Sequence, residues 1–230
     1  MRILFHEELT FISDQLVAMS RLSGRALERA TTALLEADLA LAEQVISEDE
    51  QIDAIRRDLE SRAIDVLARQ QPVATDLRQL VTALRMSSDL ERAGDLARHV
   101  AKLARMRYPE VAVPEHMREV FTRMSPLAQE MIVRAGEIVA AQDADGAVEL
   151  QLRDDAMDRY HREVFRLVLE ADPQVETQVA IDTTLLSRYL ERFADHAVSV
   201  AIRVVFLVTG TWHDELVPST GAGPVHRAEP

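Results

Sequence analysis

Two stretches of the sequence, one hundred positions apart, each present a pair of acids at helical spacing. LERAGDLARH begins at position 90 and LERFADHAVS begins at position 190. Each contains a Glu followed four residues later by an Asp: Glu91 with Asp95, and Glu191 with Asp195. Residues four apart lie on one face of an α-helix, about 6 Å apart, so each pair places two carboxylates side by side. Such carboxylates repel each other unless a cation lies between or opposite them.

A second pair of acids precedes each of these stretches. Asp49 and Asp53 are four residues apart, and Asp154 and Asp158 repeat the spacing 105 positions later. Each half of the chain therefore carries one D-x-x-x-D and one E-x-x-x-D. This arrangement indicates a duplicated unit with pseudo-twofold symmetry.

The paired acids border apolar helix faces, which suggests that they are partly removed from water. Glu191 and Asp195, for example, continue into Val198 and Ile202 at spacings of three and four. If helices bring the two pairs of one half together, four carboxylates converge. Charged groups removed from water cost several kcal/mol each unless they are compensated. Compensation could come from nearby arginines, from protonation or from metal ions, and Arg92 and Arg192 are the nearest arginines in sequence.

The donor types limit the metal ions that such clusters would bind. Carboxylate oxygens without cysteine suit hard or intermediate cations such as Mg, Mn, Fe or Ca. His99, His161 and His196 offer nitrogen as well, although each fits a surface or helix-end position better than a ligand position. The alternative is that the acids form solvated or salt-bridged helix faces, where an exposed pair contributes about 0–1 kcal/mol. Gly94, within the first E-x-x-x-D stretch, is expected to allow close helix packing.

Composition favours an all-α protein that stays in the cytoplasm. Glycine, proline and aromatic residues are sparse, and the residues that favour helices dominate. The formal charge of −13 argues against a nucleic-acid partner. Without cysteine there is no disulfide or thiolate chemistry. The N-terminal segment lacks the apolar core of a signal peptide, and the apolar segment 197–208 is too short to span a bilayer.

The apolar periodicity predicts two tandem three-helix bundles related by a pseudo-twofold axis. The expected helices cover residues 6–35, 38–72 and 75–107 in the first bundle, then 115–141, 143–170 and 175–208 in the second. Pro126 either kinks the fourth helix or marks a late start. The predicted domains are residues 1–110 and 111–210, and the tail 211–230 is expected to be disordered.

The segment from Pro72 to Asp95, PVATDLRQLVTALRMSSDLERAGD, resembles the signature of the PhoU family of bacterial phosphate-uptake regulators. The second copy, LLSRYLERFADHAVSV, looks like its counterpart in the C-terminal half of that family. The likeness extends over about residues 1–210. It implies a PhoU-like fold of two similar three-helix bundles in tandem, in agreement with the periodicity.

The resemblance implies a regulator without enzymatic activity. Family members repress the phosphate-starvation response when phosphate is plentiful, and they act on a phosphate ABC transporter and a sensor histidine kinase. From this likeness we expect a cytoplasmic negative regulator and modulator of phosphate transport that works as an adaptor between these two partners. It is expected to form a homodimer and to reach the membrane only through its partners.

Some family members bind multinuclear iron or other metals through paired E/D-x-x-x-D motifs. Carried over by position, the implied metal ligands are Asp49, Asp53, Glu91, Asp95, Asp154, Asp158, Glu191 and Asp195. The identity of the metal stays open among Fe, Mn, Mg, Zn and Ca. Family copies often have Asn four residues after the second acid, whereas this chain has His99 and Ser199.

Two other functions remain as alternatives. A helical structural or oligomerising protein without metal would have the same fold. A di-metal carboxylate enzyme of the bundle type uses Glu-x-x-His on two helices, and the nearest approach here is the single run from Asp158 to His161. The sequence has no glycine-rich phosphate-binding loop, so we expect the protein to read the state of the transporter and not phosphate itself.

Overall fold

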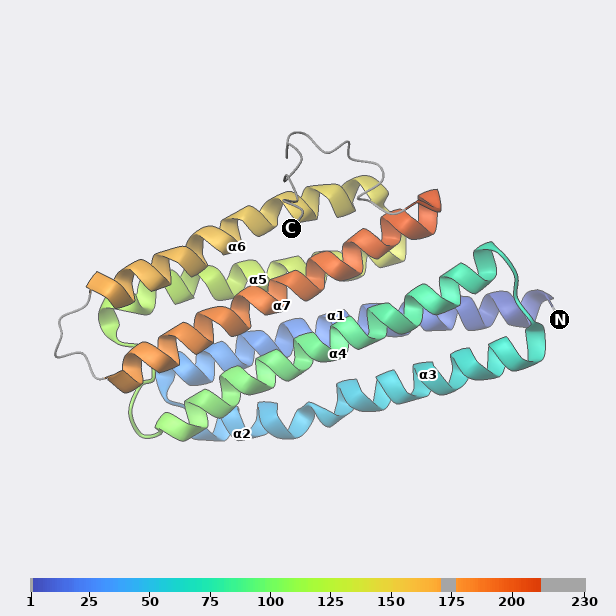
Figure 1. Ribbon diagram of the computed structural model, residues 1–230. Coiled ribbons are helices and arrows are strands. Elements are labelled where there is room, and N and C mark those ends of the chain that lie inside the picture. Colours follow the sequence, from blue (N-terminus) through green and yellow to red (C-terminus); the bar gives the residue numbers. More distant parts are fainter. Residues whose placement is uncertain (1, 171–176, 212–230) are drawn as a thin grey trace, which may run out of the picture.

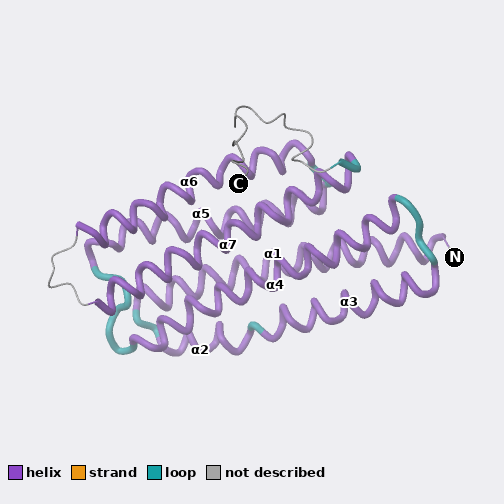
Figure 2. Tube along the Cα trace, in the orientation of Figure 1, coloured by secondary structure: helices purple, strands orange, loops and turns teal. Residues whose placement is uncertain are grey.

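The structure, a computed structural model, describes residues 2–170 and 177–211, and the elements within these ranges are helices (Figures 1 and 2). They are α1 (Arg2–Glu36), α2 (Leu39–Glu48), α3 (Glu50–Gln70), α4 (Thr75–Arg107), α5 (Glu115–Ala141), α6 (Ala144–Glu170) and α7 (Thr177–Thr209). The predicted all-α fold class is confirmed.

Helix ends follow from local chemistry. The Asp38 carboxylate accepts a hydrogen bond from the Leu41 N–H at 2.9 Å and so caps the start of α2. The Asp143 carboxylate accepts one from the Gly146 N–H at 2.9 Å and caps α6 in the same way. Pro126, whose effect the sequence left undecided, lies inside α5, and that helix runs through it.

The helix expected over residues 38–72 is not continuous, and this prediction is wrong at one residue. Asp49 separates α2 from α3 although its backbone stays close to helical, with φ −56° and ψ −33°. The Asp49 carbonyl accepts from the Ile52 N–H at 3.0 Å and from the Asp53 N–H at 3.4 Å. The shorter of these hydrogen bonds joins residues three apart, as in a 3₁₀-helix, and marks a local change in helix pitch. The chain thus changes pitch at one of the candidate ligands.

The two bundles lie side by side on a shared core. α1, α4, α5 and α7 form the middle of the molecule, with α2 and α3 along one side and α6 along the other (Figure 1). The core side chains Leu27 and Leu90 of the first half, and Phe121 and Phe193 of the second, are buried together in one apolar cluster. The division at residue 110 stays a prediction, because the two halves pack against each other as closely as their own helices do.

The two helices that carry the E-x-x-x-D motifs, α4 and α7, run antiparallel across the boundary between the halves. Asp89 of α4 accepts a hydrogen bond from Arg203 at 3.0 Å and pairs with His196 at 3.2 Å. At the other end of the contact, Arg107 of α4 donates to Asp182 of α7 at 3.0 Å. These polar contacts fix the register in which the two motif helices cross.

Two further predictions concern the ends of the chain and the membrane. Apart from Thr211, the tail 211–230 lies outside the described residues. Within the described ranges, none of the helices combines the length and apolar character that crossing a bilayer requires.

Candidate functional site

The carboxylates of the first half gather where α4 packs on the junction of α2 and α3. Asp49, at that junction, is nearly inaccessible to solvent, with 8% of its side chain exposed. Arg98 of α4 places a guanidinium nitrogen 2.6 Å from a carboxylate oxygen of Asp49, and it also forms an ion pair with Asp95. A single guanidinium therefore bridges one acid of each pair.

Gly94 makes this close approach possible. A Cβ atom at this position would lie 2.8 Å from Cδ1 of Ile52 and 3.4 Å from a carboxylate oxygen of Asp49. The first distance is shorter than real Cβ contacts, so the missing side chain lets α4 sit against the buried acid. The expectation that Gly94 serves helix packing is supported by this contact.

The other acids of the first half add negative charge at the same place. Burial and then the charge of Asp95 raise the pKa of the Glu91 carboxyl. Burial also raises the pKa of Asp49, although Arg98 opposes the shift. Arg92 reaches Asp95 at 3.7 Å but is 63% exposed, so its interaction is screened by solvent. The structure thus brings the first four acids together with Arg98 among them.

The second half gathers its four acids between α6 and α7, and these are compensated differently. Glu191 pairs with Arg188, one turn earlier on α7, and Arg188 is half exposed. Asp154 of α6 has a buried carboxylate oxygen with no hydrogen-bond partner among the described residues. Its pKa is raised to about 6, chiefly by burial and then by the charges of Asp195 and Asp158.

The remaining acids of the second half differ from Glu191 in their surroundings. Across the described ranges, neither Asp158 nor Asp195 forms a salt bridge. Burial raises the pKa of Asp195, while Arg188 acts in the opposite direction. The residue that corresponds to Arg98, one hundred positions later, is Val198. The second cluster therefore lacks the central guanidinium of the first.

The three candidate histidines lie in different surroundings. His161 of α6 shares a 3.0 Å hydrogen bond with Ser187, and burial lowers its pKa. His196 is held by Asp89 at the contact between α4 and α7. His99 stacks edge-on against Tyr189, with ring centroids 5.3 Å apart. The charges of Asp158 and Asp195 act on His161, so this histidine is a candidate nitrogen donor to the second cluster.

The predicted ligands are brought together by half, but their side chains do not converge on a point. Within residues 2–170 and 177–211, no three His, Asp or Glu side chains stand close enough to hold a metal ion as they are oriented. Arg92 and Arg192 were the arginines expected from the sequence, whereas Arg98 and Arg188 were missed. Their spacing was a usable signal, since Arg98 follows Asp95 by three residues and Arg188 precedes Glu191 by three.

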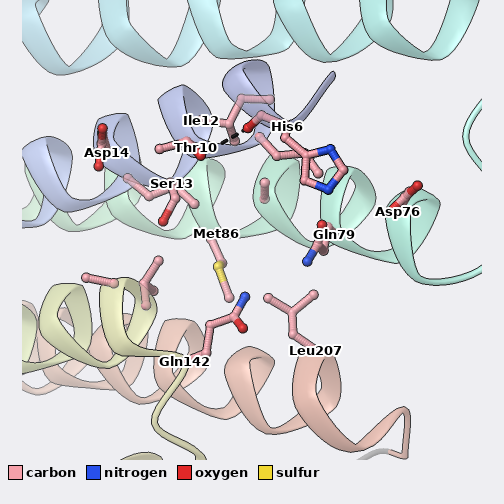
Figure 3. A pocket seen from close by; sticks show the side chains of 15 residues that line it. His6, Thr10, Ile12, Ser13, Asp14, Asp76, Gln79, Met86, Gln142 and Leu207 are labelled. Carbon is pink, nitrogen blue, oxygen red and sulfur yellow. Dashed lines mark hydrogen bonds between the residues drawn. The ribbon is translucent and has the colours of Figure 1, made fainter. Parts of the chain in front are cut away.

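A separate cavity of about 440 Å³ lies near one end of the central helices (Figure 3). It opens between α1, α4, the end of α5 and Leu207 of α7, and none of the eight acids of the clusters lines it. Its ionisable lining residues are Asp14, Asp76 and His6, and no Lys or Arg of the described chain takes part. A lining with two acids and without Lys or Arg from the described chain disfavours phosphate.

Comparisons with known proteins agree with the duplicated plan. The PhoU domain family matches residues 16–104 and again residues 121–204. The chain is 47% identical over 212 residues to the phosphate-specific transport system accessory protein PhoU homolog 2 of Mycobacterium tuberculosis, covering 92% of this chain and all of that protein. It is 44% identical to PhoU homolog 1 of Mycobacterium leprae, covering 96% of this chain and all of that protein. The crystal structure of PhoU from Pseudomonas aeruginosa superposes with a TM-score of 0.81 at 34% identity, over 90% of this chain and all of that one.

Proposed function

Because the chain belongs to the PhoU family, we propose that it is an accessory regulator of phosphate transport that represses the phosphate-starvation response when phosphate is plentiful. The family is one of non-enzymatic accessory proteins, so the alternative of a di-metal carboxylate enzyme is set aside. The observation that carries the proposal is the doubled family match, which spans most of both bundles.

In this proposal the protein is a cytoplasmic adaptor, active as a homodimer, between a phosphate ABC transporter and a sensor histidine kinase. It prefers one state of its partner and shifts the population of that state by binding it. The cavity in Figure 3, with its acidic lining, supports a protein that reads the transporter's state and not phosphate itself. Contact with the membrane would occur only through these partners.

One end of the molecule offers a surface for such docking. The contact between Arg107 and Asp182 brings the end of α4 beside the start of α7 (Figure 1). Four large apolar side chains near this contact are between 43% and 66% exposed, and we call them the docking face: Met106, Tyr108, Ile181 and Leu185. We propose that these side chains form one patch, because contiguous exposed apolar groups are typical of protein-interaction sites.

The regulatory proposal is tested in cells grown in high phosphate. Deletion of the gene is expected to release phosphate-starvation genes from repression, and unchanged repression would contradict the regulatory role. Complementation with a Met106→Asp/Ile181→Asp double variant is expected to leave the genes released, because charge on the docking face opposes binding. Ile64→Asp on α3 is the matched control, since Ile64 is 61% exposed at the opposite end. Full repression by the double variant would exclude the docking face.

We also propose that the second-half cluster binds a metal ion, with Asp154, Asp158, Glu191 and Asp195 as the ligands. Support comes from the unpartnered oxygen of Asp154 and from the absence of a bridging guanidinium in the described residues there. An oxygen-rich donor set with His161 nearby suits Mn, Fe, Mg, Zn or Ca. The ion would supply the positive charge that four clustered carboxylates need; binding requires their side chains to turn toward it.

Elemental analysis of protein purified without chelator tests this part. The wild type is expected to retain metal, and an Asp154→Ala/Asp195→Ala variant is expected to lose it. Asp155→Ala is the matched control, because Asp155 is an exposed acid on the same helix. Equal metal content in the double variant and the wild type would exclude these ligands and favour a helical protein without metal at this site.

A further inference from the structure

The first-half cluster contains four of the acids that the resemblance to the family implies as metal ligands, yet a side chain of the protein already lies between two of them. Arg98 reaches from α4 to the buried Asp49 at 2.6 Å and to Asp95 on its own helix. Its side chain is 29% exposed, so most of it is removed from water together with the acids. The cation that these carboxylates need is already part of the chain.

The internal repeat shows that this cation belongs to one half only. The acids recur after 100 positions in α7 and after 105 positions in α6, but Val198 stands where Arg98 would be repeated. Asp154, the counterpart of Asp49, keeps an oxygen without a partner among the described residues. A guanidinium thus bridges two acids in the first half, whereas in the described part of the second half Arg188 pairs with Glu191 and bridges no two acids.

We infer that Arg98 acts as a built-in cation that closes the first-half cluster to metal ions. A guanidinium satisfies two carboxylates with several directed N–H donors, and it keeps its charge at every physiological pH. A metal ion that bound Asp49 and Asp95 would have to displace this group and would then meet its positive charge at close range. The open cluster of the second half has no such competitor, and the inference rests on its proposed metal binding.

Swapping the two residues tests the inference. Arg98→Val copies the second-half residue into the first half, and Val198→Arg does the reverse. Arg85→Val is the matched control, because Arg85 is an exposed arginine of the same helix, outside the cluster. The full-length chains are stripped with chelator and dialysed against Mn²⁺. Bound metal is then counted by mass spectrometry, and folding is checked by circular dichroism.

We expect Arg98→Val to bind at least one Mn²⁺ per chain more than the wild type, since removing the guanidinium leaves four carboxylates to a hard cation. Val198→Arg is expected to bind Mn²⁺ roughly tenfold or more weakly than the wild type. Arg85→Val is expected to match the wild type. If Arg98→Val does not fold, Val198→Arg decides alone, and unweakened binding by that variant would overturn the inference.

The outcomes separate this inference from the metal binding on which it rests. A folded Arg98→Val chain that binds no more Mn²⁺ than a metal-binding wild type overturns the role of Arg98 and leaves the second-half site standing. Binding by Arg98→Val alone, with none by the wild type, supports the role of Arg98 and removes the second-half site. No binding by any variant overturns both, while the regulatory role is still decided by the repression assay.

Discussion

In the first half of the molecule, Arg98 bridges the buried Asp49 and Asp95, whereas in the second half Val198 occupies the matching position and Asp154 keeps an unpartnered oxygen in the described structure. The four-residue spacing within each pair of acids is the same in both halves, although Asp49 lies at the junction of α2 and α3 and Asp154 lies inside the continuous α6. The comparison teaches that a duplicated set of acids does not imply a duplicated chemistry. In our inference, the difference between Arg98 and Val198 decides whether two of the four carboxylates are bridged by the chain or remain available to a cation from outside.

The largest expected effect comes from removing the internal cation. In chelator, Arg98→Ala is expected to lower the free energy of unfolding by about 3 kcal/mol, because it leaves the buried Asp49 without its partner. Arg188→Ala, at the half-exposed arginine of the second cluster, is expected to cost about 1 kcal/mol or less. Urea unfolding of both variants measures the difference. Equal losses would show that the two clusters are neutralised in the same way.

A smaller effect, with opposite signs in the two halves, is expected when the matching acids Asp154 and Asp49 are made neutral. At pH 7.5, Asp154→Asn is expected to stabilise the metal-free protein by about 1 kcal/mol, a value reduced because the side chain is only partly buried and screened by water. Asp49→Asn is expected to destabilise it, since Arg98 then loses its buried partner. Urea unfolding at the same pH compares the two, and stabilisation by both substitutions would contradict the account.

The pH dependence of Asp154 sharpens this expectation. Its pKa is about 6 in the folded chain, compared with 3.8 for an ordinary aspartate. Between these values the folded protein holds a proton that the unfolded chain gives up, so this group's contribution to stability falls as pH rises through the window. Above about pH 6, where Asp154 is ionised in both states, its full unfavourable contribution to the free energy of unfolding is present. Asp154→Asn should remove this part of the pH slope, and an unchanged slope would show that another group causes it.

The smallest effect is expected at the outer arginines, which both halves share. Arg92 is 63% exposed and lies 3.7 Å from Asp95, and Arg192 is exposed at the equivalent place in α7. Alanine at either position is expected to change the free energy of unfolding by about 0.5 kcal/mol or less. Thermal unfolding in low and high salt measures this. A loss of several kcal/mol at one of them would show that this arginine, and not Arg98, neutralises the buried acids.

The sequence predicted the fold well because periodicity and proline positions determine the helices. The predicted bounds 75–107 are those of α4, and Pro72 follows the end of α3. The pitch change at Asp49 was not predictable, because the stripe of apolar residues runs through it without interruption. At that turn α4 packs closely, because Gly94 leaves room for Ile52 and Asp49.

The sequence predicted the acids of the candidate site but not the arginines, Arg98 and Arg188, that pair with them. Spacing places acids on one helix face, so the two clusters followed from the repeat. The partner of each acid depends on which arginine reaches across a helix contact, and that depends on packing. Arg98 faces Asp49 only because α4 lies close to the junction of α2 and α3. The aligned repeats show that Val198 replaces Arg98, but only the contact between Arg98 and Asp49 shows that this difference affects the acids.

The most direct test of the difference between the halves is the position of a bound ion. Crystals grown with Mn²⁺ and measured for anomalous scattering are expected to show a peak among Asp154, Asp158, Glu191 and Asp195. No peak is expected beside Asp49 and Arg98. A peak at the first-half cluster with Arg98 still in contact with Asp49, or peaks of equal height in both halves, would contradict the account.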